Sequence, residues 1–442
     1  MRADARTVAY VTKAFPRATE TFIAHEVHLL ETMGLPIRIY SIKPGERSLR
    51  HEVLDRIRAD VVTLPATESL SAQSLARWLR THWRLFGDAQ WRLLRDHPGR
   101  YLRTLVKALW MSWRHRKPGS ALPRKVFIKE FLQAGRIAAD VLARGDVGHL
   151  HGHFCHGATT VTWFVGDLCN LDFSFTAHAK DIYEPAQNPR GLLARKLRAA
   201  RFVATCTDAN RRHLLALVGD APVHTIYHGL DPEFFRPDHL SAGAANDAPL
   251  VLAVGRVTAK KGFIDLVEAC AQLRAKGIPF RCEIVGEQGD ASAALAAALQ
   301  RLGLEDGSVR LLPAMPQQHL RAHYRRAAIF VLPCLVTDSG DRDGIPNVLA
   351  EAMASGVPVV STPISGIPEL VRDGVDGLLV PARDPAALAT AIARLLADQG
   401  LRRTFGAAAR DRICEIFDAR RTTRALHRLL QDARDEPARG VA

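Results

Sequence analysis

The sequence predicts an α/β protein made of two doubly wound, Rossmann-like domains that face a central cleft. Three observations support this prediction. The 442 residues exceed the usual size of a single domain. Short apolar runs bounded by turn residues alternate with longer amphipathic segments along both halves, which is typical of βαβ units. Between the halves, residues 231–249 contain three prolines and a Ser-Ala-Gly-Ala-Ala-Asn-Asp run, a composition typical of a linker.

The first half, residues 1–230, contains seven short apolar runs that predict strands. They cover residues 7–15, 37–42, 61–65, 147–154, 173–178, 202–207 and 224–227. Helices are expected between them, for example over residues 21–33 and 208–218. This half is therefore predicted to be one complete Rossmann-like domain.

The second half, residues 250–415, begins a new series of strands and helices. Strands are predicted at residues 250–254, 281–285, 309–313, 329–333 and 358–361, and helices at 262–276, 291–302, 317–326, 346–354 and 385–397. The strands are rich in Val, Ile and Leu on both faces, as expected of parallel strands covered by helices. Residues 416–442 are expected to form a C-terminal helix that packs back on the first domain. In such sheets, ligands bind beyond the carboxyl ends of the strands.

One segment, residues 71–125, interrupts the alternation. It holds thirteen lysines and arginines against two acids, Asp88 and Asp96, and five of the six tryptophans. Basic helices that carry tryptophan suit the headgroup region of an anionic membrane. The alternative is an inserted helical hairpin with core tryptophans and a solvated arginine face. The sequence leaves both interpretations open.

Charge and cysteine usage limit the partners and the compartment. The formal charge of +14 favours phosphate-bearing substrates, an anionic surface or nucleic acid. No nucleic-acid module is recognisable, so a nucleic-acid partner is not expected. The seven cysteines are scattered without CxxC spacing, which indicates a reducing compartment. Without a signal peptide or an apolar stretch of roughly 18–20 residues, we expect a cytoplasmic protein, either free or peripheral at the inner face of the membrane.

Two cations follow the first strand of the second half. The run Leu250-Val-Leu-Ala-Val-Gly-Arg256 ends a buried strand, and a helix is expected to open near Gly262, directly after Lys261. A strand end beside a helix N-terminus already favours an anion. The planar fork of Arg256 and the point charge of Lys261 suit a diphosphate, although two ordinary surface cations in a turn would look the same.

An acidic, glycine-containing loop leads into the next candidate helix. Residues 338–347 contain three aspartates, Asp338, Asp341 and Asp343, and Glu351 lies about one turn into the helix that follows. Pro346 suits the first helical turn, and Gly344 permits close approach of a ligand to the backbone. A carboxylate on so apolar a helix is expected to face the cleft or to be paired. The spacing matches no calcium-loop pattern, so no metal is expected here.

The histidines of the first half form a second candidate group. His151, His153 and His156 resemble a metal cluster, but the strand alternation breaks before the third, so a polar patch at the strand end is favoured. His178 ends another apolar strand, where it could reach a ligand or be a satisfied core histidine. We therefore expect neither a metal nor a cofactor.

Several motifs together resemble the large retaining glycosyltransferase family 4, which has the GT-B fold. In the second half they are Val254-Gly-Arg-Val257 with Lys260-Lys-Gly262, Ile284-Val-Gly286, Asp343-Gly-Ile-Pro-Asn-Val-Leu-Ala-Glu351, Ala354-Ser-Gly-Val-Pro-Val359, Ser365-Gly-Ile-Pro-Glu-Leu370 and Gly377-Leu-Leu-Val380. In the first half the chain is most similar to colanic-acid-type exopolysaccharide enzymes. The motifs there are Lys13-Ala-Phe-Pro-Arg-Ala-Thr-Glu-Thr-Phe-Ile23, His151-Gly-His-Phe154, Thr176-Ala-His-Ala-Lys-Asp-Ile182 and Tyr227-His-Gly-Leu-Asp231.

The resemblance implies a nucleotide-sugar donor, with UDP favoured and GDP open, and a saccharide or lipid-linked saccharide acceptor. It implies that Arg256 and Lys261 hold the donor diphosphate and that Glu351 binds the ribose. Asp343 and His178 would act on the transferred sugar. The remaining implied contacts are Gly344, Ile345, Pro346 and Asn347 to the sugar, and Val285, Gly286, Glu287, Pro313 and Ala314 to the base.

The sequence departs from the family pattern at three places. Asp343 stands where the family has a longer Glu, and the glycine after Val285-Gly286 is displaced. The tight acceptor loop is replaced by Arg17-Ala-Thr-Glu-Thr21. The acceptor-side candidates are therefore Thr19, Glu20, Thr21, His153 and Lys180. Two alternative functions remain: a sugar-nucleotide epimerase on the same fold, which would act on donor alone, and a non-catalytic protein that binds an anionic surface.

Overall fold

The computed structural model describes residues 6–17, 20–46, 52–70, 73–116, 119–184, 186–237 and 248–437. The chain divides into two compact units, each with its own parallel sheet. Unit 1 comprises Met1–Cys206, Arg211–His228 and Thr423–Ala442, and unit 2 comprises Thr207–Asn210 and Gly229–Thr422. The predicted α/β fold class is confirmed.

Unit 1 is built on a seven-stranded sheet with the order β3-β2-β1-β4-β5-β6-β7. Its strands are β1 (Thr7–Thr12), β2 (Ile37–Ser41), β3 (Asp60–Thr63), β4 (Val147–His153), β5 (Phe173–Ala177), β6 (Val203–Thr205) and β7 (Val223–Thr225). All neighbours pair in parallel. Because the order reverses at β1, the topological switch point lies between β1 and β4.

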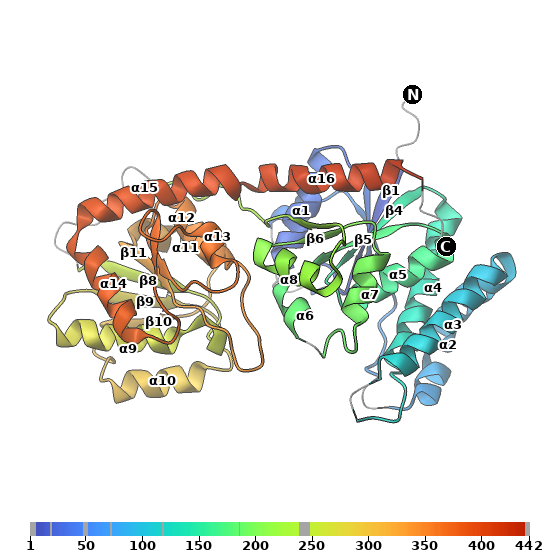
Figure 1. The fold of residues 1–442 in the computed structure, drawn as a ribbon, viewed down its shortest axis with the longest axis horizontal. Helices are drawn as coiled ribbons and strands as arrows, with labels where there is room; N and C mark the ends of the chain where they lie inside the picture. The colour runs from blue at the N-terminus through green and yellow to red at the C-terminus, as the bar shows by residue number, and fades with distance from the viewer. Residues whose placement is uncertain are drawn as a thin grey trace. The chain divides into compact units, whose positions relative to one another are not determined.

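Helices cover both faces of this sheet (Figure 1). The helices of unit 1 are α1 (Thr21–Thr32), the 3-10 turn η2 (Glu52–Arg56), α2 (Leu75–Asp96), α3 (Pro98–Arg114), α4 (Val126–Arg144), α5 (Gly157–Cys169), α6 (Ala179–Tyr183), α7 (Leu192–Ala199) and α8 (Asp208–Val218), of which α2 and α3 pack on α4. The side chains of β1 alternate between two cores. Val8 and Tyr10 pack with α1, whereas Ala9 and Val11 pack with α4 and α5.

Unit 2 has a six-stranded sheet of order β10-β9-β8-β11-β12-β13, again with all pairs parallel. Its strands are β8 (Leu250–Val254), β9 (Arg281–Val285), β10 (Val309–Leu312), β11 (Ile329–Leu332), β12 (Val359–Ser361) and β13 (Gly377–Leu379). Its helices are η3 (Ala259–Lys261), α9 (Phe263–Ala275), α10 (Ser292–Arg301), α11 (Gln317–Arg326), α12 (Asn347–Ala354), α13 (Ile367–Leu370), α14 (Pro385–Ala397) and α15 (Gln399–Ile416). Its switch point lies between β8 and β11.

The last helix, α16 (Ala419–Asp435), returns to unit 1 at Thr423. Its side chains Leu426, Leu430 and Ala433 join the core that also contains α1. Their spacing of three and four residues places them on one helical face. This packing explains why the end of the chain belongs to the unit in which the chain begins.

Each strand predicted from the sequence is present, with ends that shift by up to three residues. The prediction missed β13, whose three residues are too short to show a period. The segment 71–125 contains the α2–α3 hairpin, in which Trp78 is buried and Trp83, Trp91, Trp110 and Trp113 are exposed. The interpretation in which all of these tryptophans are core is therefore wrong. All seven cysteines are free, and six are buried. Among the described residues, none of the helices is long and apolar enough to cross a membrane.

Candidate active site

The candidate donor residues of unit 2 lie on the loops that leave β8 and β11, the strands beside the switch point. Gly255 and Arg256 follow β8, and the loop that begins after β11 carries Asp343. Parallel strands end at the same edge of a sheet, so these loops meet. The backbone N–H of Leu335 donates to the carbonyl of Lys260 over 2.9 Å, which joins the two loops directly.

A glycine allows this close approach. Gly262 has a φ of +67° and caps the N-terminus of α9. A Cβ at this position would lie 1.9 Å from the carbonyl oxygen of Pro333, at the end of β11. Only glycine therefore fits here, and its fit holds Lys261 against the loop that follows β11.

Two lysines enclose the carboxylate of Asp343. The Nζ of Lys261 lies 2.7 Å from Oδ2, and the Nζ of Lys260 lies 3.3 Å from Oδ1 of Asp343 and 3.2 Å from Oδ1 of Asp341. Burial acts to raise the pKa of Asp343, but the two lysines outweigh it and hold the pKa below its usual value. Burial likewise acts to lower the pKa of Lys261, and Asp343 outweighs it in the opposite direction. Both groups are therefore charged at neutral pH.

Arg256 differs from its neighbours because its side chain is exposed. Among the described residues it forms no ion pair, whereas Lys260 and Lys261 each have a carboxylate partner. It also lies close enough to Lys261 to affect the pKa of that lysine. The switch point therefore offers one unpaired guanidinium beside two paired ammonium groups, close to the positive N-terminal end of the 13-residue helix α9.

Glu351 lies in α12 and is buried. Its Oε1 accepts a hydrogen bond from Nε2 of Gln317 over 2.8 Å, and its Oε2 accepts one from the Tyr324 hydroxyl over 2.8 Å. Burial raises the pKa of Glu351, while these two donors offset part of the effect. Each carboxylate oxygen can still accept another hydrogen bond. Sequence reasoning expected a paired or cleft-facing carboxylate but did not find Gln317 or Tyr324, both on α11.

The predicted base-region residues follow two neighbouring strands. Val285 ends β9 and is followed by Gly286 and Glu287, while Pro313 and Ala314 follow β10. The backbone N–H of Gly286 donates to the carbonyl of Leu312 over 3.0 Å, so the two strand ends are joined. Glu287, Pro313 and Ala314 are exposed, and the structure therefore leaves this edge of the sheet accessible.

The predicted sugar-contact backbone lies at the start of α12. Gly344 accepts from the backbone N–H of Gly366 over 3.2 Å. Ile345 is partly buried and Pro346 is buried, whereas Asn347 is exposed. Pro346 takes the N-cap position, one residue before the predicted first turn. The segment from Asp343 to Glu351 thus connects two carboxylates: that of Asp343, which two lysines contact, and the buried one of Glu351.

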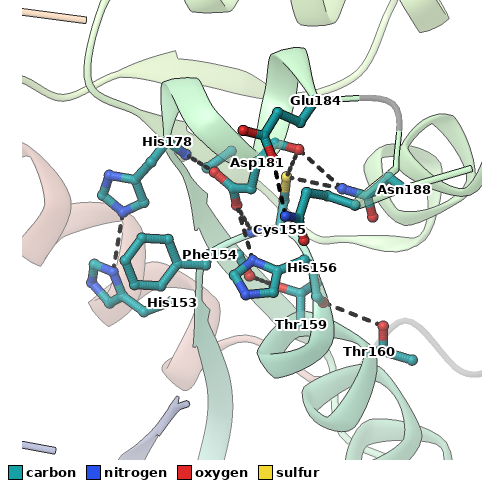
Figure 2. Close-up of polar contacts among 12 residues, drawn as sticks. His153, Phe154, Cys155, His156, Thr159, Thr160, His178, Asp181, Glu184 and Asn188 are labelled. Atoms are coloured by element: carbon teal, nitrogen blue, oxygen red, sulfur yellow. Dashed lines mark hydrogen bonds and ion pairs between the residues drawn. The ribbon is translucent and has the colours of Figure 1, made fainter. Parts of the chain in front are cut away.

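In unit 1, the candidate histidines lie at the carboxyl ends of β4 and β5. His153 ends β4 and His178 directly follows β5; both are buried. The Nε2 of His178 lies 3.4 Å from Nδ1 of His153, whose Nε2 lies 2.9 Å from Oε1 of Glu26. Figure 2 shows the two histidines facing each other beside Phe154. In the tautomer of His153 that carries its proton on Nε2, that nitrogen donates to Glu26, and Nδ1 can accept from Nε2–H of His178.

Burial keeps His178 neutral. Burial is the largest cause that lowers its pKa well below the usual value, and the nearby histidines, His228 foremost, add to the effect. His228 stacks on His178 with ring centroids 5.1 Å apart, and burial lowers the pKa of His228 to about 4. In the tautomer of His178 that carries its proton on Nε2, directed at His153, Nδ1 of His178 is a hydrogen-bond acceptor.

Asp181 fixes the loops that carry these histidines. It accepts from the backbone N–H of His178 over 2.9 Å and also from the backbone N–H of Cys155 (Figure 2). The buried Lys196 supports the same turn by donating to the carbonyls of Cys155 and His156. The Asp181 carboxylate thus binds backbone N–H groups of both loops.

The acceptor-side candidates are described only in part. Glu20, at the N-cap of α1, pairs with Arg17, and burial raises the pKa of Glu20. His153 is among the charges that act on Glu20, so the two candidates lie near each other. Thr19 lies outside the described residues, as do the side chains of Thr21 and Lys180.

One further group was missed. His178, Cys206 and His228 bring potential ligand atoms within 4.8 Å of one another, the one such trio found in the described part of the chain. The sequence had drawn attention to His151, His153 and His156 instead. Cys206 follows β6 and His228 follows β7, so only the order of strands in the sheet reveals their proximity to His178.

Comparison with known families identifies a glycosyl transferase domain in the second half of the chain. The family model described as Glycosyl transferases group 1 matches residues 248–398. The amylovoran biosynthesis glycosyltransferase AmsK of Erwinia amylovora is 31% identical over 398 residues, covering 88% of this chain and 90% of its own. A second relative is the putative colanic acid biosynthesis glycosyltransferase WcaL of Salmonella typhimurium. It is 26% identical over 438 residues, covering 96% of this chain and 99% of its own.

Solved structures share the two-sheet fold. Sucrose-phosphate synthase from Thermosynechococcus elongatus superimposes with a TM-score of 0.68 at 19% identity, covering 97% of this chain and 99% of its own. Anabaena HepE in complex with UDP gives a TM-score of 0.68 at 16% identity, covering 96% of this chain and 100% of its own. At these identities the likeness shows the fold alone.

Proposed function

The chain belongs to the group 1 glycosyl transferases, and from this membership we propose that it is a retaining family 4 hexosyltransferase that uses a nucleoside diphosphate sugar. The observation that carries the proposal is the group of cations beside the switch point of unit 2. Arg256 and Lys261 follow β8, next to the N-terminus of α9, which is where a doubly wound sheet binds phosphate.

Leaving-group chemistry explains the use of cations. The bond between the anomeric carbon and the diphosphate oxygen breaks, and the diphosphate departs with the electron pair. A new bond forms from the acceptor oxygen to the anomeric carbon. Arg256 and Lys261 would stabilise the negative charge that grows on the departing diphosphate. Asp343 holds Lys261 in place before the reaction, and Arg256 adds a second positive charge, so we propose that no metal is needed.

For retention, we propose that the acceptor approaches the face from which the diphosphate leaves. The departing phosphate oxygen takes the acceptor's proton. The pairing of Asp343 supports this route over double displacement, because its two carboxylate oxygens already contact Lys261 and Lys260. NMR of the product anomer tests this step, and an inverted anomer would exclude it.

The other predicted roles remain part of the proposal. Glu351 would accept hydrogen bonds from the ribose, and Asp343 with the backbone of residues 344–347 would contact the sugar. Residues 285–287 with 313 and 314 would border the base. In unit 1, Nδ1 of His178 would accept from a sugar hydroxyl, while Glu20 and His153 would serve the acceptor. The structural support for these last roles lies within unit 1 alone.

The relatives suggest the acceptor and the donor base. AmsK and WcaL are named for amylovoran and colanic acid biosynthesis, so we propose that this chain extends a saccharide or lipid-linked saccharide during exopolysaccharide synthesis. HepE was solved with UDP, which favours UDP over GDP. We further propose that the enzyme works in the cytoplasm, peripherally at the inner face of the membrane, where a lipid-linked acceptor would be presented.

A panel of nucleotide sugars tests the function. We expect one donor, most readily a UDP-hexose, to raise the melting temperature, and the nucleoside diphosphate to be released only when a saccharide acceptor is present. Treatment with EDTA should leave the rate unchanged. Rapid epimerisation of donor without acceptor would replace transferase by epimerase. If no member of the panel binds, the protein is not a nucleotide-sugar enzyme.

A further inference from the structure

The α2–α3 hairpin has one packed face and one bare face. Trp78, Phe86 and Leu93 of α2 and Tyr101 and Met111 of α3 are buried. Both helices pack against α4, and Figure 1 shows them side by side on the outside of unit 1. The buried side chains therefore account for only one side of each helix.

An apolar stripe runs along the bare face of α3. Leu102, Val106, Leu109 and Trp113 are 51%, 64%, 53% and 57% exposed, and they recur at intervals of four, three and four residues. This spacing puts them on one helical face. Of the twelve exposed large hydrophobic residues among the described residues, seven lie on α2 and α3. Such clustering differs from the scattered apolar exposure of an ordinary surface.

On α2, Trp83 and Trp91 are 50% and 65% exposed and are eight residues apart, so they too share a face. Gly87 lies between them. A Cβ on Gly87 would come 2.9 Å from Nε1 of Trp83, so the indole lies against the glycine. Two broad aromatic side chains thus lie half or more exposed along this helix, and neither stacks on another ring among the described residues.

The charges around these stripes are almost all positive. Arg77, Arg80, Arg84, Arg103 and Arg114 are exposed, and none of them forms an ion pair with a described residue. Of the two acids on the hairpin, Asp96 is already paired with Arg95. A pocket beside α3 adds a third feature. It is lined by Arg100, Arg103, Thr104, Lys107, Asp167 and Asn170, which places three cations against one carboxylate.

We propose that the α2–α3 hairpin docks on an anionic lipid bilayer, with both helices lying along its surface. The apolar stripe and the indoles enter the headgroup layer, while the arginines bind lipid phosphates. A second copy of the chain fits less well, since a symmetric contact would bring two arginine clusters together. The inference assigns the surface that would serve the peripheral membrane location proposed above, and it does not depend on glycosyl transfer.

Vesicle co-sedimentation of the full-length protein tests the proposal without donor or acceptor. Two vesicle types are compared: phosphatidylcholine alone, and phosphatidylcholine mixed with phosphatidylglycerol. We expect binding to the anionic vesicles to be at least about tenfold tighter than to the neutral vesicles. Four of the five tryptophans of this segment are exposed, so their emission should also shift to shorter wavelength on binding.

Two variants separate the apolar and ionic contributions. One carries Val106→Ser, Leu109→Ser and Trp113→Ser, and the other carries Arg77→Glu, Arg80→Glu and Arg84→Glu. Each should weaken anionic-vesicle binding by at least about tenfold. Matched controls change exposed residues elsewhere: Leu217→Ser, Leu311→Ser and Val375→Ser in one, and Arg394→Glu, Arg403→Glu and Arg424→Glu in the other. These controls should bind within about twofold of the parent.

Melting curves establish whether each variant is folded, and Trp91→Ser alone is a milder variant that should weaken binding by a smaller factor. The proposal fails if the folded parent does not bind anionic vesicles, or if the hairpin variants bind as well as the controls. It also fails if sedimentation shows a dimer that the hairpin substitutions dissociate while vesicle binding is absent. Because no donor is present, none of these outcomes reflects on glycosyl transfer.

Discussion

At the residue scale, the ion pair between Lys261 and Asp343 defines the electrostatic state of the candidate donor site. The pKa of Asp343 is lower in the folded chain than its usual value of about 3.9, so its ionised form stabilises the fold above that pH. That stabilisation is lost as the pH falls through the lowered value. At neutral pH, Lys260 and Lys261 are already partly compensated. An incoming diphosphate would therefore depend most on Arg256, which has no ion-pair partner among the described residues.

Replacing Arg256 with alanine should therefore slow transfer strongly. We expect the kcat of Arg256→Ala to fall about a hundredfold to a thousandfold, equivalent to about 3–4 kcal/mol of barrier, as for other lost donors to a developing anion. Donor affinity should fall about tenfold or more, because a charge-assisted hydrogen bond is lost. Steady-state kinetics and donor titration measure the two effects. Arg256→Lys, which keeps the charge but loses the fork, should lie between parent and alanine. An alanine variant with full donor affinity would refute the diphosphate assignment.

We expect the Glu351 carboxylate to lower the stability of the fold and to increase the affinity for the donor. A carboxylate with a raised folded pKa binds protons more tightly when folded, so the free energy of unfolding falls as the pH rises from about 4.3 through the raised value. Glu351→Gln cannot titrate. Relative to the parent, its stability should therefore increase across that window, as urea denaturation at several pH values would show. Donor affinity should fall about tenfold to a hundredfold, because a charged acceptor is lost. If Glu351→Gln binds donor normally, the carboxylate has only a structural role.

The partners of these residues show why a site is harder to predict than a fold. The apolar context of α12 indicated that Glu351 must be paired or face a ligand, but nothing in its local sequence named Tyr324, which comes from α11. The proximity of Cys206 and His228 to His178 arises from the order of β5, β6 and β7, a long-range property. The contact between Lys260 and Asp343 is the exception to this rule. Lys260 is next to Lys261 in the sequence, so its place in the site could have been predicted.

At the scale of elements, the positions of the charges depend on the turn between η3 and α9. Lys261 ends η3 and Phe263 begins α9, so a single residue, Gly262, connects the two helices beside Pro333. The positive φ and the nearby carbonyl both require glycine. The turn therefore determines two features together: how closely the loops after β8 and β11 approach each other, and where Lys261 lies.

Gly262→Ala should consequently destabilise the protein and weaken donor binding together. A Cβ 1.9 Å from a backbone oxygen forces the chain to move, and we expect a loss of about 2–5 kcal/mol. Gly277→Ala is the matched control. Gly277 has a φ of +68° but no atom within 4 Å of the added Cβ, so only the left-handed strain of about 1–2 kcal/mol applies. Urea midpoints compare the two variants, and donor titration should show a loss in Gly262→Ala alone. Equal effects in both variants would mean that the close approach to Pro333 is unimportant.

Elements were predictable where the sequence carries a period or a strong terminal signal. The apolar runs of β8 and β11 were located to within one residue at each end, because buried parallel strands are almost continuously apolar. β13 escaped because three residues carry no period. The segment 71–125 showed its basic and aromatic character from composition. Only the structure separates the buried Trp78 from the exposed Trp83 and Trp91, since both kinds of tryptophan interleave with arginine.

At the scale of the whole molecule, the excess of positive charge is divided between different tasks. Of the 60 lysines and arginines, thirteen lie in residues 71–125, outside the alternating strands and helices. The candidate donor site uses only a few of the remainder, and its lysines are paired with aspartates. The net charge of +14 is therefore a poor measure of the field at the donor site. The charges close to the diphosphate should matter most, because salt screens exposed charges over about 10 Å at 0.1 M.

This division predicts how salt should act on catalysis. The value of kcat/KM for the donor should fall on the order of tenfold between low and molar salt, since fixed cations attract an anionic substrate. In Arg256→Ala the dependence should be clearly weaker. The variant with Arg77→Glu, Arg80→Glu and Arg84→Glu has a net charge six units lower, yet it should keep the slope of the parent within about twofold, because the cations of the donor site, Arg256, Lys260 and Lys261, are unchanged. Initial rates with a soluble acceptor across a salt series, without vesicles, measure all three. A slope that falls with net charge in the arginine-to-glutamate variant would instead show that the whole molecule, and not the site, attracts the donor.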